Sequence, residues 1–197
     1  LFAHVLPSLP CYAPDLSDIA FDGMDFVTLP NAFFTGSNAY KGGEEQGKPL
    51  FRGLYEFNIQ HTGTPTDMLH LSAHEIIPGH YLSAVMLDLL WRANRLGFEA
   101  TVGTMATPET VFLEGWAENA FSLLYGSREA AIAAHGPALA VVFACSDLER
   151  LGKHNASVLY NRDGISVEEL QIKLATAYTQ PPHLVKKLSG LVIQHPI

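Results

Sequence analysis

The sequence predicts a mainly helical α+β protein, with a small strand-bearing part in residues 1–60 and helices through residues 61–197. Helix caps recur from Thr64 onward, whereas Gly, Pro, Asn and aromatic residues dominate the earlier segment. Hydrophobic residues make up 48% of the 197 residues and charged residues 16%, which is the balance of a globular chain with a substantial core. We therefore expect a single domain over residues 1–197.

The best strand candidate in the first part is Phe51–Gln60 (FRGLYEFNIQ). Leu54, Phe57 and Ile59 are apolar, and Tyr55 adds a residue type that favours strands. We expect the remainder of residues 1–60 to form loops with a few further strands.

The helices are predicted from their caps and breakers. Thr64-Pro65-Thr66-Asp67 combines an N-cap, a proline in the first turn and an acid three residues after the cap, which predicts a helix from Pro65 to about Ile77. Pro78 and Gly79 interrupt this helix, and a second one is expected after them. The further helices are predicted at His80 to about Asn94, Pro108 to Gly126, Pro137 to about His154, Ser166 to about Tyr178, and from Pro182 onward.

Charge and composition exclude several classes of protein. A net charge of −8 without any basic run argues against a nucleic-acid partner, because phosphate binding requires clustered Lys and Arg. No apolar run reaches the roughly 18 residues expected of a membrane span, and no secretion signal is recognised at the start. Cys11 and Cys145 do not form a disulfide framework. Compartment and oligomeric state are left open.

The pair His74-Glu75 indicates a metal centre. Zinc peptidases commonly place two His four residues apart on one helix face, with a Glu directly after the first. Here Pro78 occupies the fourth position, and the next His is His80, six residues on. On an unbroken helix His80 would lie about 120° away from His74. A bulge or break at Pro78-Gly79 could return His80 towards His74, and we predict such a distortion.

Glu114 and Glu118 are the best source of a third ligand. They are four residues apart, so both lie on one face of the predicted helix. The helix around them is otherwise apolar, and uncompensated buried carboxylates are costly. One carboxylate could ligate the metal, and the other could accept the free N–H of a ligating His.

Three alternatives follow from the same residues. His70 lies four residues before His74 and could pair with it on a regular helix, although Glu75 would then follow the second His. Possible stabilisers of a tetrahedral oxyanion are Tyr55, Tyr160, Tyr178 and His183, although a structural role is the simpler interpretation of each. A strand over Leu54–Gln60 could align an extended substrate by edge pairing.

The combined pattern resembles the DUF885 family, bacterial proteins regarded as gluzincin-like zinc peptidases. The resemblance consists of His74-Glu75-x-x-Pro78-Gly79-His80 and, 40 residues on (114 − 74), Glu114-Gly115-Trp116-Ala117. It implies a zincin-like catalytic domain within a longer family architecture. It also implies one zinc ion on His74, His80 and Glu114, with Glu75 as the general base and Glu118 as the supporting acid. Many members carry a second His where this chain has Tyr81.

The sequence therefore predicts a zinc-dependent hydrolase. We expect hydrolysis of peptide bonds by a metal-activated water, with Glu75 as the base and a peptide or small amide as the substrate. The alternative is a non-catalytic helical binding domain that keeps a metal site or its remnant.

Overall fold

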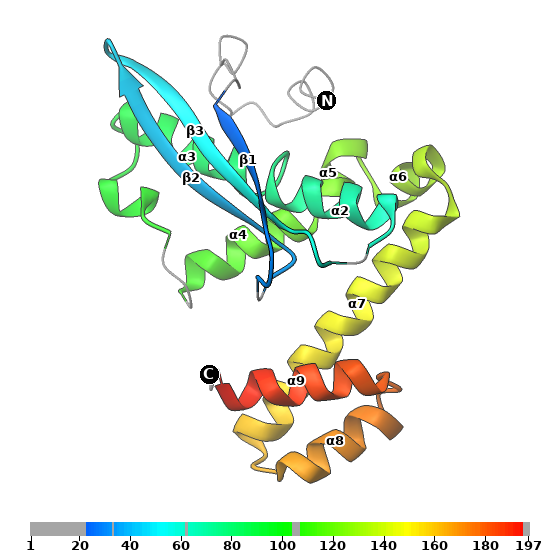
Figure 1. Ribbon diagram of the computed structural model, residues 1–197. Coiled ribbons are helices and arrows are strands. Elements are labelled where there is room, and N and C mark those ends of the chain that lie inside the picture. Colours follow the sequence, from blue (N-terminus) through cyan, green and yellow to red (C-terminus); the bar gives the residue numbers. More distant parts are fainter. Residues whose placement is uncertain (1–22, 33, 62, 104–106, 195–197) are drawn as a thin grey trace. The chain divides into compact units, whose positions relative to one another are not determined.

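The computed structural model describes residues 23–32, 34–61, 63–103 and 107–194 (Figure 1). These form two compact units, residues 1–139 and residues 140–197, and each is described here by itself. The described residues are mainly helical with one three-stranded sheet, which confirms the predicted fold class. The expectation of a single domain stays a prediction, and the loops expected in residues 1–22 lie outside the described residues.

The sheet belongs to the first unit. Its strands are β1 (Met24–Leu29), β2 (Gly36–Glu45) and β3 (Lys48–Asn58), in the order β1-β3-β2. The long hairpin of β2 and β3 is antiparallel, and β1 runs parallel to β3 (Figure 1). The predicted strand is therefore confirmed, although β3 begins three residues earlier and ends two residues earlier than expected.

The helices of the first unit follow the sheet in the chain. They are α2 (Pro65–Glu75), α3 (His80–Arg92), the short 3₁₀ helix η2 (Phe98–Thr101), α4 (Pro108–Glu118), α5 (Ala120–Tyr125) and α6 (Arg128–His135). The capping box at Thr64 and Asp67 is present as predicted. The helix expected over residues 108–126 is instead divided at Asn119, whose side-chain amide donates to the Gly115 carbonyl over 2.8 Å.

Helix α6 was not predicted from the sequence. Gly126 ends α5 in the left-handed conformation, with φ of 82°, as expected of a helix-terminating glycine. The Ser127 hydroxyl then accepts a hydrogen bond from the Ala130 amide over 3.0 Å and begins α6 directly. The overlooked indication was a serine cap immediately after the glycine.

The second unit is helical in its described residues. Helix α7 (Pro137–Ser157) enters it and continues into the π-helical turn η3 (Val158–Arg162), which is followed by α8 (Val167–Thr176) and α9 (Pro182–Gln194). These elements share an apolar core made up of Ala156, Leu170, Leu174, Leu188 and Val192. Within the described part of the chain, no helix has both the length and the hydropathy that crossing a membrane requires.

One hydrophobic cluster of the first unit joins the sheet to the start of α3. It consists of Phe51, Ile77, Tyr81, Leu82 and Val85. The Tyr81 hydroxyl donates to the Phe51 carbonyl over 2.6 Å. A Cβ at Gly53 would lie 2.8 Å from the Tyr81 ring, so this ring packs directly on the β3 backbone. The beginning of α3 is thereby fixed against the central strand.

A polar network centred on the buried Asp88 joins β2 to the far end of α3. The Tyr40 hydroxyl donates to Asp88 over 2.6 Å, and Arg92 donates to the same carboxylate over 2.9 Å. Arg92 also bonds Glu44 over 3.0 Å. Burial and the Asp88 carboxylate raise the pKa of Tyr40, so the phenol stays protonated as a donor.

Replacing Tyr40 with phenylalanine is expected to destabilise the first unit. The variant loses a hydrogen bond to a charged acceptor, and we expect the free energy of unfolding to fall by about 1.5–3 kcal/mol. Urea unfolding followed by tryptophan fluorescence measures this, because both tryptophans, Trp91 and Trp116, lie in the first unit. The matched control is Tyr160→Phe, which should leave this transition unchanged. An unaltered midpoint for Tyr40→Phe would contradict the assigned role of the network.

Candidate metal centre

The chain between α2 and α3 carries a two-residue insertion in the helical pattern. The Gly79 amide donates to the Ala73 carbonyl over 3.0 Å, and the Leu82 amide donates to the Ile76 carbonyl over 3.2 Å. Both bonds span six residues, whereas an α-helical bond spans four. His80 therefore occupies the place that the fourth residue after His74 would have on a regular helix. The distortion predicted at Pro78-Gly79 is present.

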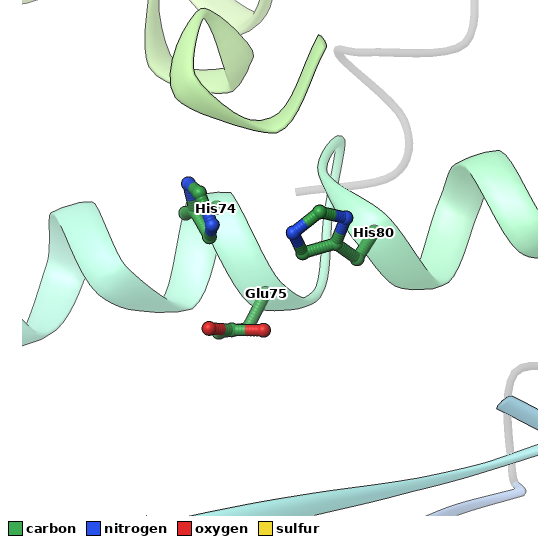
Figure 2. Close-up of side chains that lie close together, drawn as sticks. All are labelled: His74, Glu75 and His80. Atoms are coloured by element: carbon green, nitrogen blue, oxygen red, sulfur yellow. The ribbon is translucent and has the colours of Figure 1, made fainter. Parts of the chain in front are cut away.

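The two imidazoles meet across this break. The ring centroids of His74 and His80 lie 4.8 Å apart and the rings are nearly perpendicular, at 87°. Figure 2 shows the His80 ring turned back towards His74, with Glu75 beside them. The Trp116 indole donates to the Pro78 carbonyl over 2.5 Å, so α4 holds the break from outside. From the sequence, Trp116 was expected only as an apolar residue of this helix and as part of the family pattern.

Glu114 and Glu118 extend from α4 to the imidazoles. Glu114 Oε2 lies 3.8 Å from His74 Nε2, and its Oε1 lies 3.4 Å from His80 Nε2. Glu118 Oε1 lies 4.0 Å from the other ring nitrogen of His74, Nδ1. Glu114 thus faces both imidazoles, while Glu118 lies on the Nδ1 side of His74. The structure brings all the residues predicted for the site together.

Glu75 completes a group that could hold a metal ion. His74, Glu75 and His80 each offer a ligand atom, and these atoms lie within 4.8 Å of one another. The two candidate carboxylates differ in exposure: Glu75 is 8% exposed, whereas the Glu114 side chain is 49% exposed. The distances therefore allow Glu75 either to act as a base beside the ion or to bind it.

The electrostatics of the group follow from burial and charge. Burial raises the pKa of Glu75, the charge of His80 opposes this, and the charge of Glu114 adds to it, so that the pKa reaches about 7. For His80, burial lowers the pKa, but Glu114, Glu75 and Glu118 together outweigh it and raise the pKa above its usual value. Such a site, in which carboxylates surround two imidazoles, favours a bound cation.

The alternative pairing of His70 with His74 finds no support in the geometry. The His70 ring stacks on Phe121, with centroids 6.2 Å apart. Among the described residues, the group that could hold a metal ion contains His80 and does not contain His70. A regular helix would have favoured His70, and only the insertion at Pro78-Gly79 selects His80.

Two of the alternatives involve strand β3. Its central segment cannot align a substrate by edge pairing, because Leu54 pairs with Asp25 on one side and with Ala39 on the other. The Tyr55 hydroxyl oxygen is buried, which agrees with the structural role preferred for this residue. The edge-pairing idea fails because β3 is the middle strand of the sheet, which the sequence does not reveal.

The donor set fits a divalent metal ion. Two imidazoles and a carboxylate form the kind of ligand set that catalytic zinc uses, although other transition metals accept it too. The class that the fold and site define is thus a mainly helical protein with a candidate metal centre on an interrupted helix. No family model matches the chain, and no similar protein was found among the curated proteins or the solved structures. The resemblance to the DUF885 family stays a prediction.

Proposed function

We propose that this chain is a zinc-dependent hydrolase that cleaves peptide bonds. The observation that carries the proposal is the convergence of His74, His80 and Glu114 beside the buried carboxyl of Glu75. His74, His80 and Glu114 would hold the ion, and Glu118 would orient His74 through Nδ1. The resemblance of the two sequence blocks to gluzincin-like peptidases supports the same assignment.

Each residue of the group has a role in this proposal. Zinc, when bound, supplies Lewis acidity, which makes water more acidic and polarises a carbonyl oxygen. Glu75 takes a proton from the attacking water and later passes it to the leaving amine. Burial keeps bulk water from competing for the carboxyl.

In this proposal, an extended substrate would pair with an outer strand of the sheet. The outer strands of the sheet are β1 and β2, and β2 is the strand that packs against both α2 and α3. The outer edge of β2 therefore replaces the β3 segment that the sequence suggested. Main-chain hydrogen bonds to such an edge bind a peptide with little dependence on its side chains.

The test combines metal analysis with the variant Glu75→Gln. We expect the purified chain to bind zinc, measured by elemental analysis and by anomalous scattering, and to hydrolyse members of a broad peptide library. Glu75→Gln keeps the size of the side chain but replaces one carboxylate oxygen with an NH2 group and so removes the base. We expect it to retain zinc and to lose about 10²–10⁴-fold in kcat. His74→Ala, as the matched control, should lose zinc and hydrolysis together.

The outcomes separate the proposed roles. Loss of zinc in Glu75→Gln would make Glu75 a ligand and not the base. Full hydrolysis in Glu75→Gln would remove it from the mechanism. Zinc binding by the wild-type chain without hydrolysis of any peptide would favour the non-catalytic metal-binding domain instead.

A further inference from the structure

The long helix α7 (Figure 1) carries an exposed apolar stripe that the proposed function does not use. Val141 is 62% exposed, Leu148 is 53% exposed and Leu151 is 58% exposed. Ala144 and Cys145, which lie between them in the chain, are exposed as well. These five positions follow helical spacing and therefore lie on one face of α7. A contiguous exposed apolar face of this kind marks a surface that binds another protein.

The spacing within the stripe is the same in both directions of the chain. Val141 lies three residues before Ala144, and Leu148 lies three residues after Cys145. When two copies of α7 cross antiparallel on a two-fold axis between residues 144 and 145, Val141 of each copy meets Leu148 of the other. The small side chains of Ala144 and Cys145 then lie at the axis, where they let the two helices approach closely. The stripe is thus self-complementary, as a two-fold interface requires.

The distribution of charge along α7 favours the same arrangement. Residues 137–146 contain no charged side chain, whereas Asp147, Glu149, Arg150 and Lys153 all follow them. In an antiparallel pair, the charged half of one helix lies beside the uncharged half of the other. In a parallel pair, each charge would lie beside its own copy and repel it. Within one helix Asp147 pairs with Arg150, and Glu149 pairs with Lys153, so these charges are already compensated in one copy.

We propose that the α7 stripe is the interface of a symmetric homodimer in which two copies of α7 cross antiparallel. The partner is a second copy of this chain because the stripe complements itself in spacing and in charge. A single helix crossing is a small interface beside the roughly 1,200 Å² or more that stable complexes bury. We therefore expect a reversible dimer with a dissociation constant on the order of micromolar.

The first test is sedimentation equilibrium of the full chain from about 1 µM to about 1 mM, with the variant Leu148→Lys. The two-fold axis applies the substitution twice, so each dimer would have to bury two lysines, and we expect the dissociation constant to rise at least about 100-fold. The matched control is Ile172→Lys, on α8 of the same unit, because Ile172 is 63% exposed and lies outside the stripe. This control should dimerise like the wild type. A wild-type chain that stays monomeric throughout this range overturns the proposal, as does a dimer that Leu148→Lys leaves intact.

The second test is disulfide cross-linking, which reads the direction of the pair. Val141→Cys and Leu148→Cys are prepared separately in a chain that also carries Cys11→Ser and Cys145→Ser. Antiparallel pairing separates position 141 from its own copy by seven residues along the helix, roughly 10 Å, which is too far for a disulfide. We therefore expect cross-linked dimers when the two variants are mixed and oxidised, and few when either is oxidised alone. Absence of the mixed cross-link overturns the proposed arrangement, whether or not the separate variants cross-link.

Discussion

Replacing Gly79 with alanine is expected to abolish high-affinity metal binding. A Cβ at this position would lie 1.6 Å from the His74 carbonyl oxygen and 2.6 Å from that of Ala73. Both oxygens belong to backbone at the end of α2, so they cannot move away without opening the break. Alanine would therefore displace His80 from His74, and we expect the metal affinity to fall more than about 100-fold, beyond the usual effect of changing a supporting residue.

The matched control for this change is Gly115→Ala, on α4 beside Glu114. A Cβ there would meet no atom within 4 Å. Alanine is favoured over glycine within a helix, so we expect unchanged metal affinity and a gain of about 0.5–1 kcal/mol in stability. Zinc titration by calorimetry and urea unfolding measure both variants. Tight zinc binding by a folded Gly79→Ala protein would show that the break is not needed to pair the imidazoles.

Exchanging the two α4 carboxylates for amides is expected to give unequal losses of metal affinity. Glu114 approaches both imidazoles, at 3.8 Å and 3.4 Å, whereas Glu118 approaches only Nδ1 of His74, at 4.0 Å. Glu118→Gln should therefore cost about 10–100-fold in zinc affinity, the range for residues that orient a ligand, and Glu114→Gln should cost more. Competition titration with a zinc-selective chelator measures both.

The relative order of these losses is the informative result. If Glu118→Gln lost more affinity than Glu114→Gln, the ligand and the supporting acid would have to be exchanged in the proposed site. Equal and negligible losses in both variants would leave His74, Glu75 and His80 as the metal-binding group. Neither exchange should shift the midpoint of urea unfolding from that of the wild-type protein, because both carboxylates are partly exposed.

Local sequence signals predicted much of the secondary structure. The capping box at Thr64, the Thr107-Pro108 start and the Ser166 cap all lie where the structure begins a helix. Such caps act through hydrogen bonds within one turn, so a few neighbouring residues suffice to specify them. The division at Asn119 was not predicted, because it depends on a hydrogen bond from the Asn119 side chain to the Gly115 carbonyl. Helix α6 was not predicted, because Gly126 was interpreted only as the end of a helix.

The sheet was only partly predictable, because strand pairing, unlike helix capping, is not a local property. Alternating apolar residues indicated β3, but strand order depends on partners that are distant in sequence. The sequence therefore could not indicate that both edges of β3 are occupied.

The sequence by itself determined which residue types the site contains and where its interruption lies. His74, Glu75, His80 and Glu114 could be selected because metal ligation requires these side chains, and Pro78-Gly79 because these residues cannot continue a regular helix. Only the tertiary structure decided that His80 and not His70 meets His74. That choice depends on hydrogen bonds spanning six residues and on the Trp116 contact from another helix, which reset the helical register by two residues.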